Sequence, residues 1–239
     1  MKKICSLFLA FTFLSQFTFA QWKSEDRIRG NGNPTSEDRA VSGFDAILVK
    51  DGLDVYLHQS NEEKVTVEAD DNLIGSIRTE VVGNKLVIHS DKYYTDYKTL
   101  RIDVWFKDLE SITTSGGSDL TAEGTLRLDE LTLSSSGGSD IELDVETGTL
   151  HCKSSGGSDI ELTGTTKELH VQASGGSDID ADQLRSEYCW VKTSGGADAS
   201  VHASQEVKVS ASGSSDVDVR GGARVVSQSV SGSSDVNFR

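Results

Sequence analysis

The hexapeptide SGGSDI occurs at residues 136–141, 155–160 and 174–179, and it decides how the whole chain is interpreted. Close variants are SGGSDL at 115–120, SGGADA at 194–199, and SGSSDV at 212–217 and 231–236. The first residues of successive copies are separated by 21, 19, 19, 20, 18 and 19 residues. Seven copies at nearly constant spacing indicate a repeat architecture with one structural unit per copy.

Apolar and polar residues alternate on both sides of each glycine turn. In the third copy, Leu150 and Cys152 precede Gly156, and Ile160 and Leu162 follow it. This period of two predicts strand, turn and strand. One such pair cannot bury its apolar face alone, so successive copies are expected to stack as parallel coils about 4.8 Å apart. The sequence therefore predicts an all-β, single-domain, right-handed parallel β-helix (a solenoid) with coils of about 19 residues.

The N-terminus has the features of a secretory signal peptide. Residues 1–20 begin with Lys2 and Lys3, continue as a mostly apolar run and end at Ala20, which predicts cleavage before Gln21. An uncut membrane anchor is the alternative. We expect the protein to be exported to the periplasm, the outer-membrane surface or the extracellular space.

Three further regions follow the signal peptide. Residues 21–40 are polar and contain the only proline of the chain, and we expect a flexible lead-in there. Residues 41–110 alternate like strands without a helical stripe, and they are expected to form N-terminal β coils or a cap. Residues 111–239 are predicted to form the SGGSD-repeat β-helix.

The charge balance excludes several classes of partner. The 239 residues include 23 basic and 38 acidic side chains, for a formal net charge of -15. This excess of negative charge disfavours nucleic acid and anionic bilayers as partners. Beyond the signal peptide no apolar run is long enough to cross a membrane, so no membrane insertion is expected after cleavage.

Three stretches together resemble the head GIN domain family. They are VSGFDAILVKDGLDVYLHQS at 41–60, ADDNLIGSIRTEVVGNKLVIHS at 69–90, and the SGGSDI repeats. The resemblance covers about residues 41–239. Members of the family are regarded as auto-transporter adhesins of bacterial envelopes, common in Bacteroidetes-like bacteria. The resemblance implies a β-helix shaped like pectin lyases but without their catalytic residues, and an adhesive or envelope role.

An aspartate stands three positions after the first glycine of every copy. This aspartate column consists of Asp119, Asp140, Asp159, Asp178, Asp198, Asp216 and Asp235. Such side chains accept backbone N–H bonds within their own turn, so the column is predicted to stabilise the turns. A calcium stack is the alternative, because carboxylate oxygens are calcium ligands. Calcium-binding nonapeptides repeat about every nine residues, unlike these copies. We therefore predict no metal site and no cofactor.

A second set of carboxylates follows the aspartate column. It consists of Glu142, Glu161, Asp180 and Asp218, with Asp144 and Asp182 beside them. Paired carboxylates are the machinery of glycosidases, so an enzyme acting on polysaccharide (a lyase or hydrolase) is the alternative function. Regular stacking of the coils would instead align these carboxylates in a row on a flat, solvent-exposed face. The sequence has no nucleophile elbow, HExxH, phosphate loop or dinucleotide fingerprint, and we predict that the protein is not an enzyme.

The predicted ligand contacts lie five positions before the first glycine. They are His151, His170, Trp190 and Lys208, which are expected to point outward. An aromatic strip can stack on sugar rings, so the predicted partner is a glycan or a component of the envelope or a host surface. Ordinary cross-strand stacking is the alternative. The predicted function is an adhesin-like binding or structural module of the cell envelope, and a purely structural part assembled through its coil ends is a further alternative.

The two cysteines beyond the signal peptide are predicted to be buried and unpaired. Cys152 and Cys189 stand in inward columns of the third and fifth copies. Two coil steps separate their Cα atoms by at least about 9.6 Å along the axis. A disulfide spans at most about 6.8 Å between Cα atoms.

Overall fold

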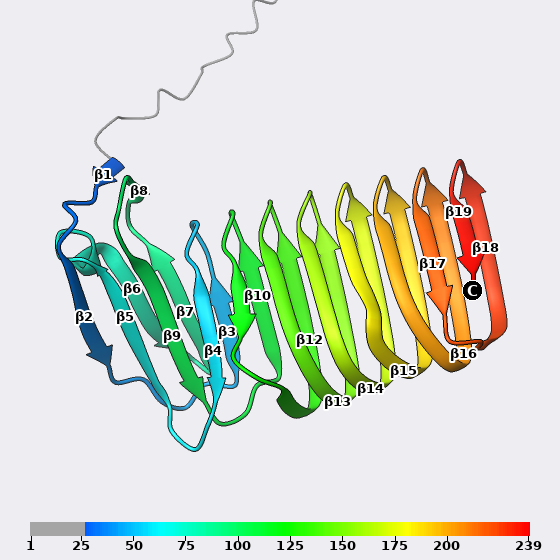
Figure 1. Cartoon of the computed structure of the whole chain (residues 1–239), viewed down its shortest axis with the longest axis horizontal. Coiled ribbons are helices and arrows are strands. Elements are labelled where there is room, and N and C mark those ends of the chain that lie inside the picture. The colour runs from blue at the N-terminus through cyan, green and yellow to red at the C-terminus, as the bar shows by residue number, and fades with distance from the viewer. Residues whose placement is uncertain (1–26) are drawn as a thin grey trace, which may run out of the picture.

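The SGGSD-type segments form tight turns that lie side by side along one edge of the molecule, at the top of Figure 1. The computed structural model describes residues 27–239, so the predicted signal peptide and residues 21–26 lie outside the described residues. From each turn the chain runs along a descending wall, bends at the opposite edge and returns along an ascending wall (Figure 1). These segments together make one coil.

The repeat region forms ten strands, and β13 to β16 each continue through the bend from one wall to the other. They are β10 (Ser111–Ser115), β11 (Leu120–Ala122), β12 (Leu126–Ser136), β13 (Asp140–Ser155), β14 (Asp159–Gly175), β15 (Asp178–Gly195), β16 (Asp198–Gly213), β17 (Asp216–Arg220), β18 (Arg224–Gly232) and β19 (Asp235–Phe238). No α-helix occurs in residues 27–239.

Successive coils pair in parallel, with their turns in register. Asp159 lies opposite Asp140 of the preceding coil and opposite Asp178 of the following coil. β13 and β14 pair without a shift, whereas β15 and β16 pair with shifts between Ala181 and Arg185. The variation in repeat length is thus absorbed away from the turns. The predicted fold class, an all-β solenoid with coils of about 19 residues, is confirmed.

The core is made of columns of apolar side chains that run the length of the solenoid. One column contains Leu150, Leu169, Cys189 and Val207, each at most 1% exposed. Their neighbours in sequence point outward, because successive side chains of a strand alternate between its faces. The alternation seen in the sequence therefore separates core from surface in every coil.

Buried serines, and not only glycines, hold the turns together. They stand two positions after the first glycine and are Ser118, Ser139, Ser158, Ser177, Ser215 and Ser234. The Ser139 hydroxyl oxygen accepts hydrogen bonds from the backbone N–H groups of Gly117 (3.1 Å) and Ser118 (3.0 Å) in the preceding turn. This column was not among the predicted functional positions, although the serine recurs in six of the seven copies.

The two glycines of each turn have different roles. The first has positive φ in every copy, whereas the second has positive φ only in Gly117, Gly138 and Gly157. Positive φ is unfavourable for residues with a Cβ atom. In the last two copies, Ser214 and Ser233 take the second position, so the change from SGGSD to SGSSD follows a change in backbone conformation.

An additional coil precedes the repeats, although its sequence differs from theirs. β3 (Ala46–Val49) and β4 (Val55–Gln59) pair in parallel with β10 and β11. Their other edges pair in parallel with β7 (Lys85–Ser90) and β9 (Leu100–Phe106). The spatial order therefore departs from the chain order, because the coil formed by β3 and β4 lies between the later strands β7 and β9 on one side and the first repeat on the other.

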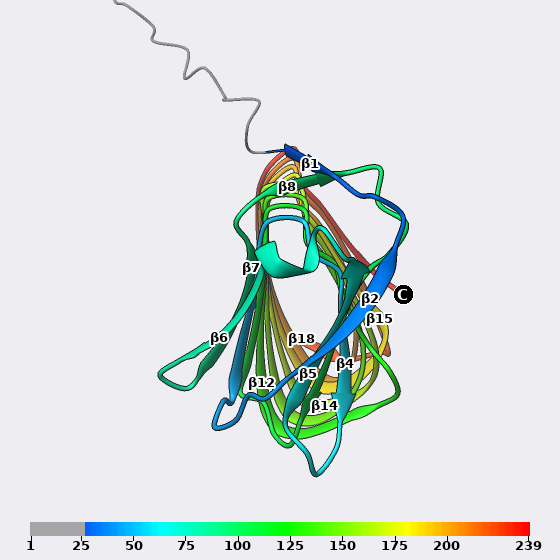
Figure 2. The same cartoon turned by 90° about the vertical axis from the view of Figure 1, so that its left-hand side faces the viewer.

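The N-terminal end of the solenoid is covered by antiparallel strands (Figure 2). These are β2 (Pro34–Arg39), β5 (Lys64–Asp70) and β6 (Ile77–Val82), with the short 3-10 helix η2 (Ile74–Ser76) between β5 and β6. Beside them β1 (Arg27–Arg29) pairs in parallel with β8 (Tyr93–Thr95).

The described part of the expected flexible lead-in is not flexible coil but contains strands β1 and β2. The side chains of β2 are almost all exposed, and their polarity suggested a linker. Its backbone nevertheless pairs with β5 from Pro34 to Arg39. The buried Asp70 carboxylate also accepts the N–H of Gly32 at 2.8 Å, which fixes the entry to β2. Backbone pairing at a sheet edge leaves little trace in side-chain composition.

Candidate functional site

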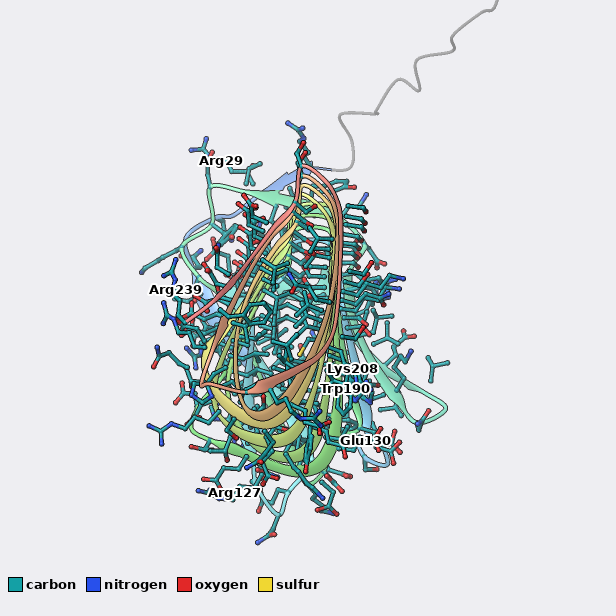
Figure 3. The ribbon with its side chains drawn as sticks, turned by 90° about the vertical axis from the view of Figure 1, so that its right-hand side faces the viewer. Arg29, Arg127, Glu130, Trp190, Lys208 and Arg239 are labelled. Atoms are coloured by element: carbon teal, nitrogen blue, oxygen red, sulfur yellow. The ribbon has the colours of Figure 1, made fainter. Side chains whose placement is uncertain are left out.

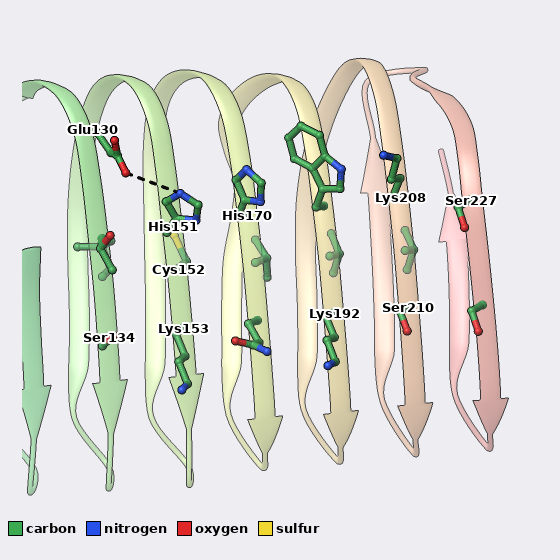
Figure 4. A pocket seen from close by; sticks show the side chains of 18 residues that line it. Glu130, Ser134, His151, Cys152, Lys153, His170, Lys192, Lys208, Ser210 and Ser227 are labelled. Carbon is green, nitrogen blue, oxygen red and sulfur yellow. Dashed lines mark ion pairs between the residues drawn. The ribbon is translucent and has the colours of Figure 1, made fainter.

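The four predicted ligand residues lie in one row on the outside of the ascending wall (Figure 4). His151 of β13 lies opposite His170 of β14, which lies opposite Trp190 of β15. Trp190 in turn lies opposite Lys208 of β16. We call these four residues the ring row. Seen from the C-terminal end, Trp190 and Lys208 project outward from the same side of the coil (Figure 3).

The rings of this row stack on one another. The ring centroids of His151 and His170 are 4.4 Å apart with planes at 24°, and those of His170 and Trp190 are 4.4 Å apart at 9°. The Lys208 ammonium lies 5.6 Å from the Trp190 ring centroid, within cation–π range. At the other end, Glu130 Oε1 lies 3.9 Å from His151 Nε2. A carboxylate and an ammonium group therefore flank the stack.

The stack changes what the row can offer a ligand. His170 has a ring stacked on each of its faces, and Trp190 has His170 on one face and the Lys208 ammonium near its ring. Stacking of a sugar needs a free aromatic face, which His170 lacks. Ring nitrogens, the indole N–H and the lysine ammonium are the groups that this row offers for hydrogen bonding.

Burial and the neighbouring His151 lower the pKa of His170, and Glu168 opposes this shift only in part. Glu168 Oε2 lies 3.9 Å from His170 Nε2. A lowered pKa keeps the His170 imidazole neutral at pH 7, with one nitrogen as donor and the other as acceptor. His170 therefore adds no positive charge to this surface at neutral pH.

A second outward row lies two positions nearer to the turns, and the sequence analysis did not identify it. This lysine row consists of Ser134, Lys153, Gln172, Lys192 and Ser210. Lys153, Gln172 and Lys192 lie opposite one another on neighbouring strands. The available signal was a lysine at the same repeat position in alternate copies of an acidic chain. It was weak, because the other members of the row are serine or glutamine.

The ring row and the lysine row border a shallow groove that follows the solenoid axis (Figure 4). Its volume is about 740 Å³. Between the rows, the floor is the strand backbone of one buried column, whose side chains point into the core; it consists of Leu133, Cys152, Val171, Val191 and Val209. Ligand pockets typically enclose about 300–1,000 Å³, and the volume of the groove lies within this range.

The aspartate column occupies the other side of the turns. The predicted hydrogen bonds within each turn are replaced by bonds between coils: Asp140 Oδ1 accepts the N–H of Asp159 at 3.3 Å, and Asp159 Oδ1 accepts that of Asp178 at 3.3 Å. Parallel stacking brings each carboxylate close to the next coil, so these side chains link coils. Burial raises the pKa of Asp119 and Asp178, and the neighbouring aspartates Asp140 and Asp159 respectively raise it further.

Within residues 27–239, no group of three or more His, Cys, Asp or Glu side chains is arranged to hold a metal ion.

The second carboxylate set forms a row on the descending wall. Glu142, Glu161 and Asp180 lie opposite one another, and Asp182 pairs with Arg220. A hollow beside Glu142 and Glu161 has a volume of about 130 Å³. This is below the size of typical ligand pockets. The arrangement is a charged wall and not a cleft with opposed carboxylates.

This repeat protein thus presents one long groove and one acidic wall on its parallel coils. Residues 43–223 match the family described as "Putative auto-transporter adhesin, head GIN domain". The chain belongs to this family, so the resemblance noted in the sequence is confirmed.

Several solved structures have the same fold. A "putative adhesin" from Bacteroides fragilis NCTC 9343 matches with a TM-score of 0.80 and 21% identity, over 88% of this chain and 98% of that chain. A "putative adhesin" from Parabacteroides merdae ATCC 43184 matches at 0.75 and 20%, over 90% and 99%. A "putative lipid binding protein" from Parabacteroides distasonis ATCC 8503 matches at 0.73 and 20%, over 89% and 99%.

A comparison with curated protein sequences gives no match. No helix in the described part of the chain has the length and apolar character needed to cross a membrane.

Proposed function

We propose that this protein is an exported, non-enzymatic binding module of the cell envelope that holds a glycan in the groove between the ring row and the lysine row. The observation that carries the proposal is the groove itself. Its volume of about 740 Å³ extends over several in-register coils on an otherwise regular wall. An elongated groove on a rigid solenoid suits an elongated ligand, as in other repeat proteins.

Membership of an adhesin family supports a surface-binding role. The related structures are less than 25% identical, so they support the fold alone. One of them is named for lipid binding. In the present chain the groove is open, and beside Trp190 it is bordered by lysine, histidine, serine and glutamine side chains; these polar and charged groups favour a polar ligand over an acyl chain.

The alternative of a polysaccharide-cleaving enzyme receives less support. Glu130 is the one carboxylate that lines the groove among the described residues, and it lies near His151 at one end. Glycosidases need two carboxyl groups on either side of the scissile bond. The carboxylates of the descending wall lie side by side in a row, which does not provide that arrangement.

A glycan array tests the proposal on the protein that begins at Gln21, with and without calcium. We expect binding to a subset of glycans, and loss of that binding in His170→Ala and Trp190→Ala. Glu161→Ala on the descending wall is the matched control and should bind as the parent does. Glycan binding that is indifferent to both groove substitutions would contradict the proposed site. Release of shortened saccharide products would favour the enzyme alternative.

A further inference from the structure

We propose that the ligand of this groove is a linear acidic polysaccharide, with carboxylate or sulfate groups that pair with Lys153, Lys192 and Lys208. The inference rests on the proposed function and specifies the class of glycan. It depends on the positions of the three ammonium groups, on their lack of acidic partners within the described residues, and on the acidic character of the opposite wall.

The three lysines are spread along the axis of the groove. Lys153 and Lys192 stand in the lysine row two coils apart, with Gln172 between them. Two strand spacings amount to about 9.6 Å. Lys208 belongs to the ring row on the next coil beyond Lys192. A compact anion cannot reach all three groups, whereas a chain that follows the axis and carries repeated anions can.

The lysines of the groove have no acidic partner. Among the residues that the structure describes, Lys153 and Lys192 make no ion pair and no side-chain hydrogen bond, and Lys208 makes only its contact with Trp190. In a chain of formal charge -15, acidic partners are plentiful. Unpaired ammonium groups along one groove are therefore available to an external anion.

Three carboxylates lie beside the ring row, and one of them is paired with an arginine. Glu130 lies near His151, Glu168 lies near His170, and Glu206 pairs with Arg224. The large acidic surface lies on the descending wall, across the turns. A polyanion is repelled by that wall and attracted to the groove, so the distribution of charge selects the face as well as the ligand.

Neutral glycans and nucleic acids fit these observations less well. A neutral sugar would cover the ammonium groups without supplying a counter-charge, which costs desolvation energy. Single-stranded nucleic acid binds through bases stacked on free aromatic rings. His170 has both faces stacked within the ring row and offers no such platform.

The test compares polymers that differ only in charge. Polygalacturonate and its methyl ester form one pair, and dextran sulfate and dextran form another. We expect the protein that begins at Gln21 to bind the charged member of at least one pair, and to bind it more weakly as salt is raised. In the double variant Lys153→Gln and Lys192→Gln, the Kd should rise about tenfold or more.

A matched double variant controls for the loss of two positive charges. Lys107 and Lys167 are exposed and lie outside the groove, so Lys107→Gln with Lys167→Gln should change the Kd less than about twofold. An equal loss in both double variants would overturn the inference, because it would reflect net charge alone.

Other outcomes separate the inference from the proposed function. Equal binding of charged and neutral polymers, abolished by Trp190→Ala, would overturn the inference and leave the glycan site standing. Binding of single-stranded DNA as tight as that of the acidic polysaccharides would overturn the choice of glycan. Failure of both polyanions to bind at low salt would also overturn the inference of an acidic polysaccharide ligand. Glycan binding unaffected by any groove substitution would refute the proposed function as well.

Discussion

Cys152 and Cys189 lie on opposite sides of the β14 coil and in different inward columns. Cys152 is paired in register with Val171, whereas Cys189 is paired with Leu169. Both thiols are buried and free. The predicted burial of both cysteines in inward columns is thus confirmed, and the stacking of the coils places a complete strand between them.

The thiols should behave as small apolar core groups. Burial raises the pKa of Cys189 to about 12 and raises that of Cys152 further. A thiol with so high a pKa carries almost no thiolate at pH 8 and reacts slowly. We expect no labelling by a thiol reagent in the native protein that begins at Gln21, and two labelled thiols after denaturation without reductant. No labelling after denaturation would reveal a disulfide and an incorrect register.

The two glycine positions of the turn provide a matched pair of substitutions. Gly138 has φ +75, whereas Gly176 does not have positive φ and has open space around its missing Cβ. Gly138→Ser should lower the free energy of unfolding by about 1–2 kcal/mol, because a left-handed backbone is unfavourable for residues with a Cβ. Gly176→Ser should leave it nearly unchanged, as the natural Ser214 and Ser233 suggest. Chemical denaturation of both variants measures the difference, and equal losses would contradict this explanation of the SGSSD copies.

Removal of a buried serine hydroxyl should destabilise the stack. Ser139→Ala leaves the N–H groups of Gly117 and Ser118 without their acceptor. Unsatisfied buried amides cost about 1–3 kcal/mol, so the midpoint of denaturation should fall accordingly. Ser136→Ala, in the same turn, is the control, because its hydroxyl is half-buried and makes only a 3.5 Å contact with the Thr114 carbonyl. A change as large in the control would show that the hydroxyl bonds are not responsible.

Within the aspartate column, the Asp178 carboxylate should reduce stability at neutral pH. The folded-state pKa of Asp178 is raised by burial and by Asp159. A raised carboxyl pKa favours the native state at pH values below the unfolded pKa, and this advantage is lost as pH rises through the folded pKa. Asp178→Asn should therefore stabilise the protein at pH 7, by at most about 1 kcal/mol because the group is largely exposed. Thermal melts at pH 7 and pH 3 should show the gain only at pH 7, and a loss at pH 7 would contradict it.

The regular part of the fold could be predicted because each copy repeats the same information. Alternation placed residues such as Leu150 and Ile160 in the core, and the spacing set the coil length. The additional coil at 46–59 could not be recognised in the same way. Its turn has Leu53 where the repeats have a buried serine, and its neighbours in space come from distant segments. Long-range pairing of this kind depends on the whole sheet and not on local pattern.

The site could be predicted only in part. The column of His151, His170 and Trp190 becomes visible when the copies of the repeat are aligned with one another. The structure brings these three rings together. Their mutual stacking depends on the strand spacing and on side-chain rotamers, so the sequence did not show that the ring faces are occupied. Lys153 and Lys192 appeared as ordinary surface lysines until the register placed them beside one groove.

The central claim is that ligand lies along the groove of the ascending wall, and a crystal structure with an acidic oligosaccharide tests it most directly. Crystals of the protein that begins at Gln21, soaked with oligogalacturonate, should show saccharide between the ring row and the lysine row, with carboxylates near Lys153 and Lys192. Saccharide bound at the acidic wall or at a coil end, with the groove empty, would contradict the account.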